Sequence, residues 1–147
     1  MGHHVERTLL VAASPEVAFD YVADFSRAQE WDPGIPSARR LDEGEIGQGS
    51  RFELVSRFGS TEQTIVYELT EHDRPSRVTL VGDGKNFHGT DTISFAPLDA
   101  GGARVTYVAD LGLKGLAALA VPFLRGRLDE MSDAAVSGLQ AALDRLA

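Results

Sequence analysis

The stretch GLAALAVPFLRGRLDEMSDAAVSGLQAALDRLA, residues 115–147, decides the fold that the rest of the chain has to fit. Its apolar side chains recur every three to four residues, the spacing of one face of an α-helix. They are Leu116, Ala120, Leu124, Leu128, Met131, Ala135, Leu139, Ala142 and Leu146. At roughly 1.5 Å per residue such a helix would be about 40 Å long, enough to cross a whole sheet. Pro122 and Gly126 predict a kink or a late start near Phe123.

Upstream of this helix, residues 37–113 alternate apolar and polar side chains with period two, in runs separated by short turns. The pattern predicts a meander of about six strands that pair as antiparallel hairpins. The side chains predicted to face inward are Phe52, Leu54, Ile65, Tyr67, Val78, Leu80, Ile93, Phe95, Val105, Tyr107, Ala109 and Leu111.

The first third of the chain predicts one strand and two short helices. Residues 5–12 form the strand candidate, and Ser14 followed by Pro15 is a typical helix start, because Ser caps the first turn and Pro fits its first position. The second helix should end at Trp31, since Pro33 and the glycine after it do not continue a helix easily.

Composition limits what the chain can do. Its 147 residues are 43% hydrophobic, which fits a single domain over 1–147. The formal net charge of -8 argues against a surface for nucleic acid or anionic membranes, and no apolar run is long enough to span a bilayer. The absence of cysteine excludes thiolate metal sites and fits a cytoplasmic location.

The order of these elements resembles the helix-grip fold of the START and Bet v 1-like (SRPBCC) superfamily, and within it the bacterial polyketide cyclase/dehydrase-like branch. The resemblance is carried by ASPEVAFDYVADFSRAQEWDP at 13–33, GQGSRFEL at 47–54 and GGARVTYVADLGLKG at 101–115. It implies an α+β fold in which a curved antiparallel sheet wraps around the C-terminal helix and leaves a ligand pocket between them. Members mostly bind apolar small molecules, and a few cyclise or dehydrate polyketides.

Two ionisable side chains are candidates for chemistry in such a pocket. Asp91 has the inward parity of Ile93 and Phe95, so burial would raise its pKa and make it a usable acid or base. Alternatively, it reaches water at a strand end, or a bulge at Gly89 reverses the parity. Arg127 lies at the edge of the apolar helix face, where it either holds a substrate oxygen or extends outward along the helix.

A larger set of side chains is predicted to contact the ligand. Trp31 is either a structural plug at the edge of the sheet or a wall of the pocket. The full set comprises Trp31, Phe52, Leu54, Ser56, Tyr67, Leu80, Ile93, Tyr107, Phe123, Leu124 and Met131.

No metal site or cofactor is expected. His72 is predicted in a turn and His88 on the solvent side, and neither has a second ligand at metal-binding spacing. His3 and His4 are either native or the remnant of a purification tag, and no role is assigned to them.

Three functions remain open. The first is a binding protein for a hydrophobic or aromatic small molecule, as expected for a pocket with few ionisable groups. The second is a polyketide cyclase or dehydratase that uses Asp91 or a tyrosine as acid or base and Arg127 to stabilise an enolate. The third is an interaction protein that docks a partner on its sheet or helix edge. The oligomeric state is left open between monomer and homodimer.

Overall fold

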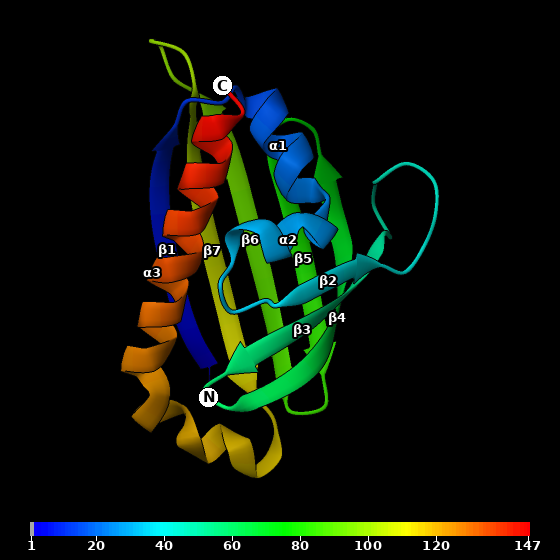
Figure 1. Ribbon diagram of the computed structural model, residues 1–147, viewed down its shortest axis with the longest axis vertical. Helices are drawn as coiled ribbons and strands as arrows, with labels where there is room; N and C mark the ends of the chain where they lie inside the picture. The colour runs from blue at the N-terminus through cyan, green and yellow to red at the C-terminus, as the bar shows by residue number, and fades with distance from the viewer. Residues whose placement is uncertain (1) are drawn as a thin grey trace.

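The strands and helices of the computed structural model, which describes residues 2–147, follow the predicted order (Figure 1). The strands are β1 (Gly2–Val11), β2 (Ser37–Arg40), β3 (Arg51–Phe58), β4 (Thr61–Asp73), β5 (Arg77–Gly84), β6 (Phe87–Pro97) and β7 (Ala103–Leu113). The helices are α1 (Pro15–Ala23), η1 (Phe25–Arg27), α2 (Ala28–Trp31), η2 (Gly115–Ala120) and α3 (Val121–Arg145), where η marks a 3₁₀-helix. This order confirms the predicted helix-grip fold.

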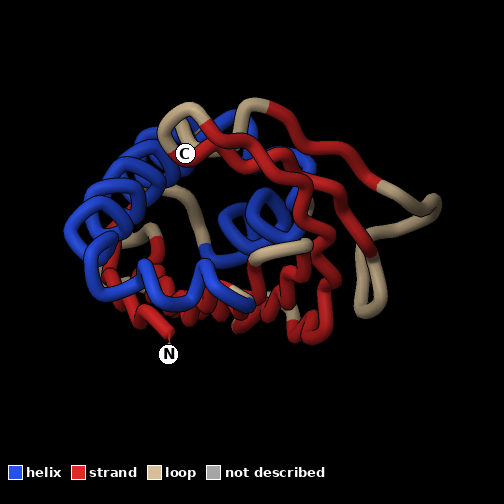
Figure 2. Tube along the Cα trace, turned by 90° about the horizontal axis from the view of Figure 1, so that it is seen from below, coloured by secondary structure: helices blue, strands red, loops and turns tan. Residues whose placement is uncertain are grey.

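All the strands belong to one antiparallel sheet, in the order β1-β7-β6-β5-β4-β3-β2. Consecutive strands pair as hairpins, and β1 closes the far edge by pairing with β7. The sheet bends around α1, α2 and α3, which lie on its inner side (Figures 1 and 2). The predicted inward face is confirmed: ten of its twelve side chains are buried, while Tyr107 and Leu111 are half-buried.

The start of α1 is the one predicted from sequence. Ser14 has an extended backbone, and its Oγ accepts a hydrogen bond from the Val17 N–H at 3.2 Å. Pro15 follows in the first turn, where the amide hydrogen that proline lacks is not needed. The second short helix, α2, ends at Trp31, also as predicted.

The long helix α3 packs on the sheet mainly with its C-terminal half, and Val121 is the one buried residue of its first half. Its start at Val121, with Pro122 in the first turn, confirms the predicted late start. Leu139 and Leu143 are fully buried, whereas Leu128, one of the apolar residues in the first half, is only half-buried. The first half therefore lies less tightly against the sheet, and this is where space remains beneath the helix.

A glycine lets α3 approach α2 closely. A Cβ placed on Gly138 would lie 1.9 Å from the backbone oxygen of Trp31, so no other residue fits there without moving the helix. The Trp31 side chain is 4% exposed, and its ring meets the Tyr107 ring edge-on at 6.3 Å. Trp31 thus links α2, α3 and β7, which is the structural role considered for it from sequence.

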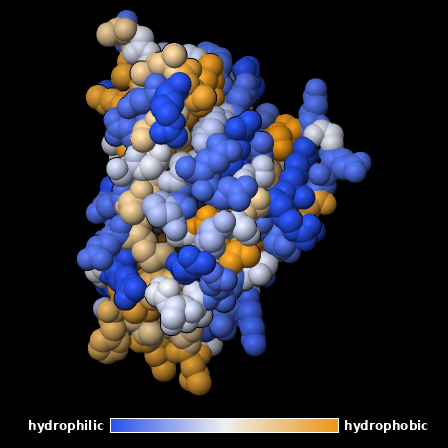
Figure 3. Space-filling view, viewed as in Figure 1, coloured by the Kyte–Doolittle hydropathy of each residue, from blue (hydrophilic) through white to orange (hydrophobic). Residues whose placement is uncertain are grey.

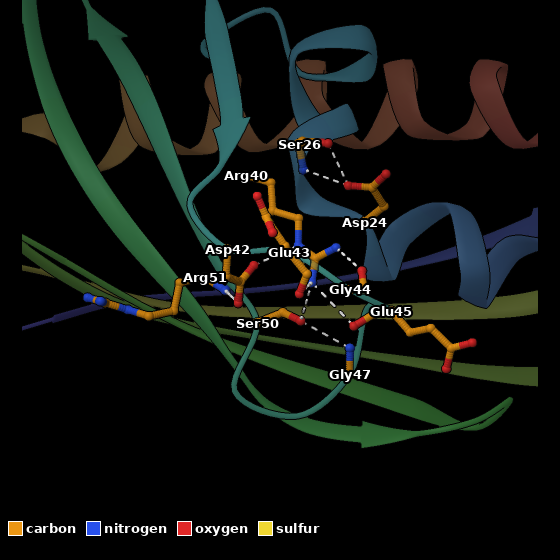
Figure 4. Close-up of polar contacts among 10 residues, drawn as sticks. All are labelled: Asp24, Ser26, Arg40, Asp42, Glu43, Gly44, Glu45, Gly47, Ser50 and Arg51. Carbon is orange, nitrogen blue, oxygen red and sulfur yellow. Dashed lines mark hydrogen bonds and ion pairs between the residues drawn. The ribbon is translucent and has the colours of Figure 1, made fainter.

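The loop between β2 and β3 is held by Arg40 (Figure 4). Its guanidinium donates to Asp42 Oδ1 at 2.6 Å and to the backbone oxygens of Glu43 and Glu45. Ser50 Oγ accepts the Gly47 N–H at 3.0 Å and closes the turn before β3. Residues 44–50, GEIGQGS, therefore form the turn that precedes β3, and none of them lines the cavity described below.

The end of the molecule formed by η2 and the start of α3 exposes apolar side chains. Leu116, Leu119 and Phe123 are 71–88% exposed, and they account for the apolar surface at the lower end of Figure 3. The prediction that Phe123 contacts a ligand inside the pocket therefore needs correction, because its side chain points outward. No helix within residues 2–147 is long and apolar enough to cross a membrane.

Candidate functional site

Two adjoining chambers lie between the sheet and residues 121–136 of α3. The inner chamber has a volume of about 130 Å³ and the outer chamber about 280 Å³. Phe87, Leu111, Leu128 and Met131 line both of them. Together the two volumes reach the range of small-molecule sites, about 300–1,000 Å³. The space predicted between helix and sheet is therefore present.

Six polar side chains line the inner chamber: Arg7, Ser132 and a group of four that each come from a different element or loop. Tyr67 comes from β4, Asp91 from β6, Tyr107 from β7, and Asp32 from the turn after α2. The remaining lining is mostly aliphatic or aromatic. The inner chamber is therefore an apolar space with one polar cluster.

Asp91 faces inward from the middle of β6. It pairs with Leu80 on one side and Ala109 on the other, and its side chain is 6% exposed. Gly89 continues the regular pairing of β6 with both neighbours, so no bulge reverses the parity. The alternative that Asp91 reaches water at a strand end is therefore wrong. Tyr107 donates its hydroxyl hydrogen to Asp91 Oδ2 at 2.6 Å.

The environment of Asp91 favours its protonated form. Burial raises the pKa of its carboxyl to about 6, although the hydrogen bond from Tyr107 lowers the pKa and offsets part of this effect. The negative charge of Asp32 adds to the rise. Burial and the nearby Asp91 also raise the pKa values of Tyr67 and Tyr107 well above their ordinary range, so both keep their hydroxyl hydrogen.

Asp32 is a member of the cluster that the sequence analysis missed. Its Oδ1 accepts the Gly34 N–H at 2.8 Å, as expected for an aspartate in a Pro-Gly turn. Burial nevertheless raises the pKa of Asp32 to about 6. In the sequence, Asp32 before Pro33 and Gly34 is fully accounted for as a turn residue, so nothing there indicated that it also lines a cavity. The packing of α2 beneath α3 brings it to the inner chamber.

Arg127 lies apart from this cluster. Its guanidinium carbon lies 5.2 Å from the centre of the Phe58 ring. A Cβ placed on Gly59 would lie 3.5 Å from Arg127 Nη2. It lines neither chamber. The prediction that Arg127 and Asp91 act on one ligand in the same cavity therefore needs correction: the arginine extends outward and covers the β3–β4 turn.

The residues predicted to contact a ligand separate into two groups. Tyr67 and Tyr107 line the inner chamber, Leu124 lines the outer one, and Met131 lines both. The others, Phe123 apart, lie in the core around the chambers or on the sheet beside them and line neither: Trp31, Phe52, Leu54, Ser56, Leu80 and Ile93. The alternation along a strand thus predicts which side chains face inward, but it does not predict which of them line the cavity and which lie in the packed core.

The histidines are also partly different from expectation. His72 lies within β4, where its ring packs edge-on against Phe19 at 5.0 Å, so its assignment to a turn was wrong. His88 is exposed, as predicted. His3, to which no role was assigned, is buried and lines the outer chamber. Among residues 2–147, no three His, Asp or Glu side chains are grouped so that they could hold a metal ion.

The comparison with known proteins decides the family, because the match extends over nearly the whole chain. Residues 2–147 match the family described as polyketide cyclase / dehydrase and lipid transport. The chain belongs to this family. No curated protein shows significant similarity to it.

Solved structures of the same fold agree with this assignment. A START superfamily protein from Mycobacterium smegmatis is 20% identical, with a TM-score of 0.81 over 99% of both chains. The Zhui aromatase/cyclase from Streptomyces sp. R1128 is 17% identical, with a TM-score of 0.78 over 99% of this chain and 95% of its own. At these identities the likeness shows the fold alone. The family as a whole supports a role in ligand binding or cyclisation.

Proposed function

We propose that this protein binds a hydrophobic small molecule, lipid-like or polyketide-like, in the two chambers between the sheet and α3. One observation carries the proposal: between Val121 and Leu139 no side chain of α3 is fully buried, and two adjoining, mainly apolar chambers lie beneath this part of the helix. Burial of an apolar ligand there is favourable by about 25 cal/mol per Å² of apolar surface. The polar cluster at Asp91 would fix the orientation of the ligand.

A cavity-filling variant tests this proposal. Ala135 lines the inner chamber from α3, whereas the adjacent Ala134 is exposed. The neutral dye N-phenyl-1-naphthylamine should bind the wild type saturably, in a ratio of one to one. We expect Ala135→Leu to weaken the binding at least tenfold and Ala134→Leu to change it less than twofold. Dye binding that does not saturate, or that Ala135→Leu leaves unchanged, would refute the proposal.

A second candidate function is favoured by the buried carboxyl with a pKa of about 6. An acid of that strength can take up a proton and return it near neutral pH. In a cyclase reaction the Asp91 carboxylate would remove a proton from a carbon next to a ketone. That carbon would attack a second ketone of the same chain, and Asp91 would return the proton to the alkoxide that forms. The resulting hydroxyl would then leave as water together with a hydrogen of the adjacent carbon. The hydroxyl of Tyr67 would donate a hydrogen bond to the enolate oxygen.

The neutral triketone 2,4,6-heptanetrione offers a direct assay. Joining its first and sixth carbons with loss of one water gives 3,5-dihydroxytoluene, which absorbs in the ultraviolet. If Asp91 is the base, the wild-type rate rises with pH through about 6 and Asp91→Asn lowers it at least a hundredfold. Arg127→Ala should keep the rate within twofold. If the wild type does not accelerate the reaction, or Asp91→Asn keeps the full rate, this function is excluded for Asp91.

A further inference from the structure

Two residues that line the outer chamber, His3 and Gln63, each have a buried polar atom without a hydrogen-bond partner: His3 Nδ1 and Gln63 Oε1. Among the side chains of residues 2–147 these are the two atoms of this kind. Both belong to residues that line a chamber whose walls are mainly apolar. Because unpaired polar groups in apolar surroundings cost free energy, two of them in the wall of one chamber favour a place for polar atoms of a ligand beside them.

The geometry of His3 defines what its free nitrogen can do. The ring is 6% exposed, and Nε2 lies 2.9 Å from Oδ1 of Asp129 on α3. An ionised carboxylate only accepts hydrogen bonds, so Nε2 carries the hydrogen in this pair. In the neutral ring Nδ1 is then an acceptor, and it calls for a donor such as a hydroxyl. The amide of Gln63 can both accept and donate, which also suits a hydroxyl.

The charges along both chambers disfavour anions. The inner chamber contains the carboxyls of Asp32 and Asp91, and neither forms an ion pair with a described residue. Arg7 is the only lysine or arginine among the described residues that line the two chambers. Its Nε already forms an ion pair with Asp133 Oδ1 at 2.8 Å. A ligand carboxylate would meet negative charge in the inner chamber and a free acceptor in the outer one.

The strand register gives the distance between the two polar places. His3 stands opposite Leu111 and Asp91 opposite Ala109, so their levels differ by two residues, about 7 Å at roughly 3.3 Å per residue. They also lie two strands apart, which is about 10 Å at roughly 4.8 Å per strand. A ligand that reaches both therefore needs polar groups at opposite ends of an extended apolar body.

We propose that the outer chamber is a second polar subsite, and that the ligand is a neutral, elongated, apolar molecule with a hydroxyl at each end. One hydroxyl binds at Asp91 and Asp32, and the other binds at His3 and Gln63. Carboxylates of the same shape bind poorly. This inference rests on the proposed binding function, because it needs a ligand in the cavity.

Three biphenyl probes test it by isothermal titration calorimetry: 4,4′-biphenol with two hydroxyls, 4-phenylphenol with one, and 4′-hydroxybiphenyl-4-carboxylate. We expect the wild type to bind 4,4′-biphenol about five- to tenfold more tightly than 4-phenylphenol, the usual effect of one added hydrogen bond. The carboxylate should bind most weakly. His3→Phe should reduce the ratio of the two phenols to about one, because it keeps the ring and removes the free nitrogen. Gln63→Met should reduce the ratio in part.

His4→Phe is the matched control, because His4 is exposed on the next position of β1 and binds Asp110 on the surface. It should leave the ratio unchanged. Equal affinity for the two phenols, a ratio that survives both His3→Phe and Gln63→Met, or tightest binding of the carboxylate would overturn the second subsite while cavity binding stands. Failure of all three probes to bind would overturn both proposals. Circular dichroism of each variant checks that it folds, and if His3→Phe does not fold, Gln63→Met decides alone.

Discussion

The buried carboxyl of Asp91 should make the stability of this protein fall as the pH rises through weakly acidic values. Its pKa is raised from the ordinary 3.8 to about 6 in the folded state. Below pH 3.8 both folded and unfolded chains hold the proton, so Asp91 has no effect. Between pH 3.8 and 6 the folded chain holds it more tightly, so the free energy of unfolding falls with rising pH. Above pH 6 the loss is complete.

The size of the effect follows from the difference between the two pKa values. The difference is about two pH units, and each unit corresponds to about 1.4 kcal/mol, which gives a loss of about 3 kcal/mol. Asp91→Asn has the same shape and no titration, so it lacks this loss. The unfolding free energy of the wild type minus that of Asp91→Asn should therefore fall by about 2 kcal/mol between pH 4.5 and 7.5, the upper part of the range.

Urea unfolding at a series of pH values, followed by circular dichroism, measures this difference. Asp32, whose charge interacts with that of Asp91, adds to the fall, while carboxyls that do not interact with Asp91 titrate equally in both proteins and cancel in the subtraction. Asp99→Asn is the matched control, since Asp99 is exposed in the β6–β7 turn, and the fall seen with Asp91→Asn should exceed any change seen with this variant. A flat curve for Asp91→Asn, or one that rises with pH, would show that Asp91 is not held in a desolvated site and would refute the reasoning.

Two further predictions concern the neighbours of this site. Asp32→Asn should lower the pKa of Asp91, because the charge of Asp32 helps to raise it; carboxyl ¹³C NMR titration measures the change, and an unchanged or higher value would contradict the account. Gly138→Ala should lower the free energy of unfolding by about 3 kcal/mol, because the added carbon overlaps the Trp31 backbone. Gly126→Ala, which meets open space on the same helix, should raise it by up to about 1 kcal/mol in the same thermal or urea denaturation. Equal effects of the two alanines would refute the close contact.

The fold was readable from the sequence because two periodicities dominate it. A period of two along residues 37–113 gave the strands and their inward face, and the three-to-four spacing of the last third gave α3. Local signals fixed the helix ends: Ser14 with Pro15 began α1, and Pro33 stopped α2 after Trp31. Each of these signals involves only a few neighbouring residues, so it can be recognised in the sequence without knowledge of the tertiary structure.

The site was only partly readable, because it depends on how distant elements meet. Parity showed that Asp91 faces inward, but parity could not separate chamber walls from solid core. A rotation of α3 by a small angle decides whether Arg127 points into the cavity or over Phe58. Asp32 and His3 reach the chambers through the packing of α2 and β1 against α3, which no local pattern encodes.

The central claim is that a ligand binds between the sheet and α3, and methyl NMR tests it most directly. Met131, in α3, lines both chambers and is the sole methionine besides Met1, while Ala109 faces the inner chamber from β7. With methionine and alanine methyl groups labelled, bound 4,4′-biphenol should give intermolecular NOEs to both Met131 and Ala109. Saturating binding without an NOE to either methyl group would contradict the account, because the ligand would then lie outside the cavity.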